Sequence, residues 1–333
     1  MKSGYSSIWW ILLAGGVVVV FLLQMVVGSY PVSVSDLLSV KNIDPGVRDI
    51  LLQSRLPAAI AATFGGAALA VGGLQMQTYF RNPVAGPFVL GISSGASLGV
   101  AIFVMLSGML GIMADIPGGL ILSSSVGAVL MFALVTLIAH RLNNAVSMLI
   151  IGLMLASFIN AVIEAIQTIA TADAIKSYLF WTMGSYRTIT LAQVPVMITV
   201  ISSALAISIT LIKPLNLLLT GEEYARLSGL NVSRSRFWIV ISTCLLTGGV
   251  TAFCGPVGFI GLAVPHLARG LFRTSDHKVL LPATILLGAS ISGLCNLLTA
   301  IPIHGLVFSI NTITSLIGAP FVIWIVFRGR ALR

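Results

Sequence analysis

The chain has 333 residues, of which 57% are hydrophobic and only 8% are charged, and its mean hydropathy is +1.07. This composition excludes a water-soluble globular domain and predicts a protein that crosses a membrane several times. The net charge of +9 does not indicate nucleic-acid binding, because the basic residues are scattered over many connecting segments instead of forming one patch.

Ten apolar stretches approach the roughly 20 residues that a helix needs to cross a bilayer. The first is too long for the apolar part of a signal peptide, and no clean cleavage site follows it. The eighth is short and contains Pro265, so it must pack among other helices. We predict an all-α polytopic fold in a single domain, residues 1–333. The ten stretches are Ile8–Gly28, Pro57–Phe80, Val89–Leu110, Pro117–Ala139, Val146–Ala170, Leu191–Ile212, Phe237–Gly255, Gly258–Phe272, Val279–Ile301 and Leu306–Phe327.

The basic residues predict the orientation. With the N-terminus in the cytoplasm, thirteen of the 18 basic residues fall on the cytoplasmic side of the ten stretches. This is the asymmetry that the positive-inside rule requires. Both termini are therefore predicted to be cytoplasmic.

Small residues line the second and third stretches. Gly66 and Ala70 belong to such a face on the second, and Gly91, Gly95 and Gly99 recur every four residues on the third. We predict that these two helices pack tightly together. The letters from Gly91 to Gly95 also match a nucleophile elbow, but that motif needs a preceding strand and a histidine partner, so we interpret it as packing.

The fifth stretch carries polar residues at helical spacing. A carboxylate facing lipid at mid-bilayer costs about 2.5–3.5 kcal/mol on insertion scales, so this stripe should face protein or water. We favour a water-filled translocation pathway, and the alternative is a sealed contact between helices. The predicted pathway residues are Ser157, Asn160, Glu164, Thr168 and Thr171.

The segment 214–236, between the sixth and seventh stretches, is charged and amphipathic. Gly221 and Gly229 should divide it into two short helices that lie on the membrane. Glu222, Arg226 and Ser233 are predicted to share one side. Apolar residues, Leu217, Leu218, Tyr224, Leu227 and Leu230, are predicted to supply another. Such a segment either docks a soluble partner or covers lipid headgroups.

Motifs for metal or nucleotide chemistry are missing from the sequence. The three cysteines and four histidines are dispersed, without the spacing of metal ligands. No Gly-Lys dipeptide occurs, so there is no phosphate-binding P-loop. If ATP is used, a separate subunit must bind it, and we expect no cofactor on this chain and no enzyme activity.

Several ordered motifs resemble those of the permease subunits of type II ABC importers for ferric siderophores, haem and vitamin B12. The resemblance runs from about Arg55 to Arg328. The matching motifs are Arg55-Leu56-Pro57, Gly65 to Ala70 with Gly73, Asn82-Pro83-x-Ala85-x-Pro87, Gly221-Glu222-Glu223 with Leu227-Ser228-Gly229, Gly255-Pro256-x-Gly258-Phe259-Ile260-Gly261, Pro265-His266, Asp276-His277 and Gly318-Ala319-Pro320.

The resemblance implies a transport complex in the inner (cytoplasmic) membrane: two permease copies, two ATPase subunits that carry ATP and Mg, and a periplasmic or lipid-anchored substrate-binding protein. It places ATPase coupling at Gly221, Glu222, Glu223, Ala225, Arg226, Leu227 and Gly229. It places the cytoplasmic gate at Asn82, Val84, Asn144, Ala145 and Val146. Docking of the binding protein is expected at Arg55, and by predicted topology at Arg48, Lys176 and Arg187.

The chain departs from the family pattern before Gly318, where Phe308-Ser309-Ile310-Asn311 replaces the usual Leu-Pro-Val/Ile-Gly turn. The substrate is expected to be a metal chelate, with a ferric siderophore ahead of haem or vitamin B12. An alternative is an ion-coupled secondary transporter in which Glu164 is the coupling residue, because such proteins place ionisable groups inside the membrane.

Overall fold

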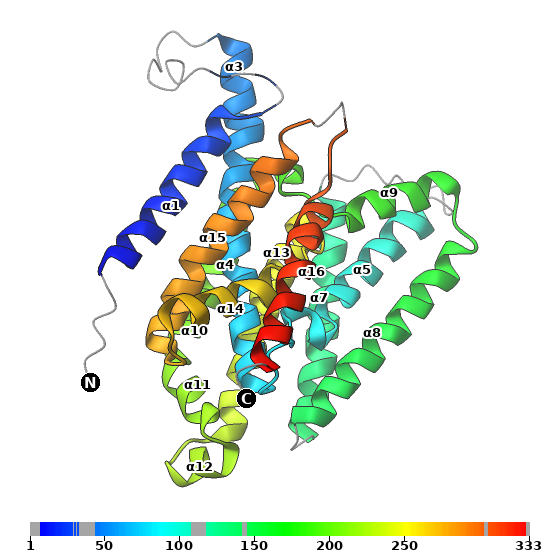
Figure 1. The fold of residues 1–333 in the computed structure, drawn as a ribbon. Coiled ribbons are helices and arrows are strands. Elements are labelled where there is room, and N and C mark those ends of the chain that lie inside the picture. The colour runs from blue at the N-terminus through cyan, green and yellow to red at the C-terminus, as the bar shows by residue number, and fades with distance from the viewer. Residues whose placement is uncertain are drawn as a thin grey trace.

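The computed structural model describes residues 7–28, 30, 32, 44–107, 118–141, 145–302 and 306–330. Within these residues every secondary-structure element is helical, which confirms the all-α prediction (Figure 1). Short 3-10 or π-helical turns lie at Ile50–Arg55, Pro87–Leu90, Ile102–Leu106 and Tyr186–Thr188. The α-helices are α1 (Ser7–Val26), α3 (Pro45–Asp49), α4 (Leu56–Tyr79), α5 (Ile92–Ala101), α7 (Gly119–Arg141), α8 (Ala145–Gln167), α9 (Ala172–Thr182), α10 (Val194–Thr210), α11 (Ile212–Leu219), α12 (Glu222–Leu227), α13 (Val232–Cys254), α14 (Ile260–Phe272), α15 (His277–Thr299) and α16 (Ile310–Arg330).

Each predicted apolar stretch coincides with a helix or a pair of joined helices. Five stretches in the described part of the chain are long and apolar enough to cross a membrane alone, and they include α1, α4, α8, α13 and α15. Together α10 and α11 qualify as a sixth, bent by 52°. The remaining four contribute shorter apolar helical segments, Ile92–Met105, Gly119–Val135, Ile260–Phe272 and Ile310–Ile323. The short eighth stretch forms the helix α14, with Pro265 inside it.

The core of the bundle surrounds α4, which packs against α13, α14 and α15 (Figure 1). Backbones approach closely there, so glycine is required. A Cβ added at Gly73 would overlap the carbonyl oxygen of Gly261 on α14, and one at Gly66 would overlap that of Gly288 on α15. These contacts hold the three helices at a separation that no larger residue permits.

The predicted tight pairing of the second and third spans is wrong. The glycine face of α5 packs against α7 instead, where a Cβ at Gly99 would overlap the carbonyl oxygen of Ser123 and one at Gly127 that of Gly95. The small residues of α4 meet α14 and α15. Each small-residue face was identified correctly, but both were assigned to the wrong partner, because helix spacing does not say which neighbour a face meets.

One end of the bundle carries α11 and α12, which lie between α10 and α13 at the bottom of Figure 1. The predicted glycine breaks are confirmed. Gly221 precedes α12 with φ +119° and Gly229 follows it with φ +83°, a region that favours glycine. Asn231 then begins α13, and its side-chain oxygen accepts a hydrogen bond from the backbone N–H of Arg234 at 2.9 Å.

Candidate functional site

The candidate site is the α11–α12 segment, which has an inner and an outer side. Its inner side anchors it, since Leu215 and Ala225 are fully buried and Leu218 nearly so. Its outer side presents large exposed apolar side chains, with Leu227 87% and Tyr224 60% exposed. The apolar residues predicted to form one face therefore divide between the two sides.

The outer side has the character of a docking surface. Glu223, Arg226 and Ser228 are exposed around Leu227. Exposed apolar residues rimmed by charges are typical of a surface that another protein covers. Of the seven predicted coupling residues, Ala225 cannot touch a partner because it is buried, and the two glycines shape the turns.

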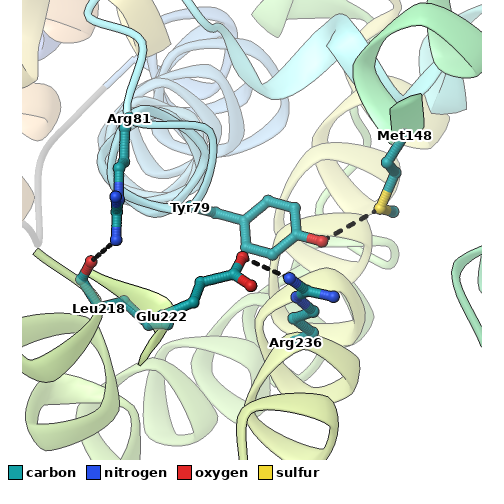
Figure 2. Close-up of polar contacts among 6 residues, drawn as sticks. All are labelled: Tyr79, Arg81, Met148, Leu218, Glu222 and Arg236. Carbon is teal, nitrogen blue, oxygen red and sulfur yellow. Dashed lines mark hydrogen bonds and ion pairs between the residues drawn. The ribbon is translucent and has the colours of Figure 1, made fainter. Parts of the chain in front are cut away.

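Glu222 turns inward, contrary to the prediction that it shares a side with Arg226 and Ser233. Its carboxylate pairs with Arg236 on α13, whose residue surface is only 8% exposed (Figure 2). Ser233 belongs to α13, beyond the break at Gly229, so it cannot continue the face of α12. The ion pair fastens the start of α12 to the bundle.

Two further contacts in Figure 2 connect this region to neighbouring helices. The Arg81 guanidinium, just after α4, donates to the Leu218 carbonyl oxygen at 3.1 Å. The Tyr79 hydroxyl donates to the Met148 Sδ at 3.3 Å, which links the end of α4 to the start of α8. The α12 segment, α4 and α8 thus meet at one end of the bundle.

A polar cluster attaches α11 to α15 and α4. The Asn216 amide donates to Asp276 Oδ1 at 2.6 Å, and its oxygen accepts from the His277 backbone N–H at 2.9 Å. In the His277 ring, Nδ1 lies 2.7 Å from the same Asn216 oxygen, and Nε2 lies 2.9 Å from the Thr78 Oγ1. The pKa of Asp276 is lowered, mainly by the backbone N–H of Lys278 and further by Asn216. Nothing in the sequence indicated a role for Asn216.

Two of the five predicted gate residues have described side chains. Asn82 and Val84 are on the α4–α5 connector, where the Asn82 side-chain oxygen accepts from the Val84 backbone N–H at 3.0 Å. The next carbonyl along, that of Pro83, lies 2.7 Å from His266 Nε2 on α14. Asn144 and the side chains of Ala145 and Val146 lie outside the described residues.

The predicted pathway residues are exposed on the single chain. Ser157, Asn160 and Glu164 lie on the open face of α8. Because α8 ends at Gln167, Thr168 lies just beyond it, and Thr171 instead caps α9 by accepting the Ala174 backbone N–H at 3.4 Å. The stripe is therefore shorter than predicted and does not extend along one helix to Thr171.

Arg55 has an internal role that the sequence did not indicate. Its guanidinium donates to the carbonyl oxygens of Met25, Val26 and Tyr30, at and beyond the end of α1. Those carbonyls have no partner within the helix, so a cation there stabilises the terminus. Lys176 on α9 and Arg187 are exposed, and Arg187 lines the same cavity as Arg55.

The departure at Asn311 is explained by its contacts. The side-chain amide donates to the carbonyl oxygens of Thr182 at 3.2 Å and Pro256 at 2.7 Å. Its oxygen accepts from the Gly258 backbone N–H at 2.9 Å. Asn311 therefore joins α9, the α13–α14 connection and α16, which a glycine at this position could not do.

Comparison with known proteins gives a consistent result. The model of the FecCD transport family matches residues 16–328. The chain is 32% identical over 293 residues to the hemin transport system permease protein HmuU of Yersinia pestis, covering 85% of each. It is 34% identical over 280 residues to the vitamin B12 import system permease protein BtuC of Klebsiella pneumoniae, covering 84% of this chain and 82% of that one. Among solved structures, an ABC transporter described as of the metal-chelate type, in an inward-facing conformation, matches with a TM-score of 0.85 and 28% identity, covering 97% and 100% of the two chains.

Proposed function

The chain belongs to the FecCD transport family, and from this premise we propose that it is the membrane-spanning permease subunit of an ATP-driven importer. The observation that carries the proposal is α12, which presents Tyr224 and Leu227 outward while Glu222 fastens it inward. A separate ATPase subunit would cover that surface. No chemistry on the substrate is involved.

In this mechanism the ATPase subunits move α11 and α12 as they close on ATP. The Glu222–Arg236 pair would pass that movement to α13, and the Asn216–His277 contacts would pass it to α15 and α4. Packed helices move as rigid bodies, so the displacement would reach the gate at the Asn82–Val84 connector and at the start of α8.

The cargo proposed for this chain is a metal chelate, with a ferric siderophore ahead of haem or vitamin B12. Relatives named for hemin and vitamin B12 support this class. The partners would be a second permease copy against the open face of α8, two ATPase subunits, and a substrate-binding protein on the side of α9. The location would be the inner membrane of the cell.

Uptake by proteoliposomes tests this function. Permease and ATPase subunits would be reconstituted together, with ATP enclosed on the ATPase side and the binding protein loaded with a ferric siderophore, haem or vitamin B12 outside. We expect uptake only when the ATPase subunit is active. Uptake that persists with an inactive ATPase and stops when ion gradients are collapsed would favour the secondary transporter with Glu164 as coupling residue.

A further inference from the structure

A groove of about 590 Å³ opens beside the α11–α12 segment, and no residue of α12 lines it. Its walls are the last turns of α10, the start of α11 and the first turns of α13. The chain bends by 52° between α10 and α11. Among the lining residues are Ile207, Thr210, Leu211, Leu230, Arg234 and Trp238.

The groove is amphipathic along its length. Ile207 and Trp238 line the part that lies further into the membrane spans, whereas Asn231 and Arg234 lie at the end of α13 nearest α12. With a rise of about 1.5 Å per residue, the wall from Asn231 to Trp238 spans about 10 Å. An apolar slot with a polar rim at the membrane surface matches the profile of a lipid, with its chain below its headgroup.

The rim carries a cation without an acidic counterpart. Arg234 is exposed, and within the described part of the chain neither the ion pairs nor the groove lining provide a carboxylate for its guanidinium. Trp238 follows four residues later on the same face of α13 and is 39% exposed. Arginine and tryptophan at this spacing are typical of the membrane–water interface.

We propose that this groove binds one anionic phospholipid, with its phosphate at Arg234 and one acyl chain along Ile207, Leu211 and Trp238. Charge complementarity selects an anionic headgroup. A lipid fits better than the ATPase subunit because the groove opens between two apolar membrane spans, whereas the outward residues of α12 belong to a different surface. A bound lipid would stabilise the bend between α10 and α11. Any effect of the lipid on coupling to the ATPase subunit rests on the proposed function above.

The test uses the tryptophan in the groove as a reporter. A permease that retains Trp238, with Trp9, Trp10, Trp181 and Trp324 replaced by phenylalanine, would be placed in phosphatidylcholine vesicles. A small mole fraction of brominated phosphatidylglycerol or brominated phosphatidylcholine would then be added. We expect quenching by the anionic lipid to be about fivefold more effective, since one cation near the surface favours it by that factor.

Charge variants provide the controls. Arg234→Gln should remove the preference and Arg234→Lys should keep most of it. Lys278→Gln is the matched control, because it removes an exposed charge at the same end of the bundle outside the groove lining. Phospholipid that co-purifies with the natural chain, measured by mass spectrometry, should likewise fall in Arg234→Gln alone, and this second measurement does not need the tryptophan replacements.

Three results would overturn the proposal. One is equal quenching by both lipids, and another is a preference that Arg234→Gln and Lys278→Gln change equally. The third is loss of quenching when the ATPase subunit binds, which would assign the groove to that subunit. None of these measurements requires transport or ATP, so their failure would leave the proposed importer function untouched.

Discussion

The helices α4 and α8 are both long and apolar, yet they differ in how far one chain completes their surroundings. The most apolar 18-residue window of the α4 span is 78% buried within the chain, and that of α8 is 17% buried. The glycines of α4 meet the backbones of α14 and α15, while α8 leaves Met154 and Phe158 exposed beside its polar stripe. Hydropathy does not predict this difference in burial, because the less buried α8 is the more apolar of the two, whereas the small residues of α4 do predict it. The surroundings of α4 are complete within one chain, whereas α8 and the outer side of α12 are exposed and are the surfaces that we propose partners cover.

The largest expected effect comes from adding one methyl group at the close contact between α4 and α14. Gly73→Ala should destabilise the permease by about 3 kcal/mol or more, because its Cβ would overlap the Gly261 carbonyl oxygen and backbone cannot move aside as a side chain can. Thermal unfolding in detergent and the yield of monodisperse protein measure this. Gly270→Ala on α14 is the control, since nothing lies within 4 Å of its added Cβ. Equal stability of the two variants would contradict the close α4–α14 contact.

On the exposed outer side of α12, a substitution should weaken binding of the ATPase subunit without changing the stability of the permease. Leu227→Asp should weaken association with the ATPase subunit by about 2 kcal/mol, roughly 30-fold, since a buried apolar anchor at an interface contributes that much. The permease itself should unfold at its normal temperature, because Leu227 is 87% exposed. Ser228→Asp introduces the same charge next to it and should cost far less. If binding, measured by surface plasmon resonance, tolerates Leu227→Asp, α12 is not the docking surface.

Substituting the adjacent residues Glu222 and Glu223 separates the attachment of α12 to the bundle from the docking of a partner on α12. Glu222→Ala should loosen α12, because it removes the carboxylate from the buried Arg236, and after allowance for its partial exposure the cost is about 1–2 kcal/mol. Glu223→Ala should leave α12 in place, since Glu223 is exposed. Hydrogen exchange of residues 221–229 should rise in the first variant only. Restoration by the exchanged pair Glu222→Arg with Arg236→Glu would confirm the ion pair, and equal exchange in both single variants would speak against it.

The sequence predicted the positions of these elements better than their contacts. Apolar runs located the ten helices or pairs of joined helices, of which five or six are long and apolar enough to cross a membrane in the described residues. Gly221 and Gly229 located the ends of α12, because a positive φ favours glycine. The inward orientation of Glu222 could not be predicted from helical spacing, because its partner Arg236 lies beyond the break in the helix. Asn216 and Asn311 act through contacts to residues 53 or more positions away, including Gly258 and His277, and spacing along one helix carries no information about such contacts.

Cysteine labelling should map the open side along α8. In a background without Cys244, Cys254 and Cys295, single cysteines at Ser157, Asn160 and Glu164 should react with water-soluble thiol reagents about 10-fold faster than one at Ile163, if the exposed stripe faces water in the assembled transporter. Ile163 is only 4% exposed on the same helix and is the matched control. Uniform protection at all four positions would mean that a partner seals the stripe, as in the alternative of a helix–helix contact.

The smallest expected effect concerns the binding protein, at the opposite end of the molecule from α12. Arg55 is occupied by the carbonyls that end α1, whereas Arg48 is exposed on α3. Arg48→Gln should therefore slow association with the binding protein by a few-fold at low salt, because an exposed ion pair contributes about 0–1 kcal/mol, and the difference should vanish as salt rises. Arg55→Gln should instead lower the unfolding temperature, because the α1 carbonyls lose their donor, while the association rate stays close to that of the natural chain. Stopped-flow association at two salt concentrations and thermal unfolding separate these effects. An association rate that falls in Arg55→Gln, with normal stability, would return Arg55 to the docking surface and leave the end of α1 to be stabilised by other groups.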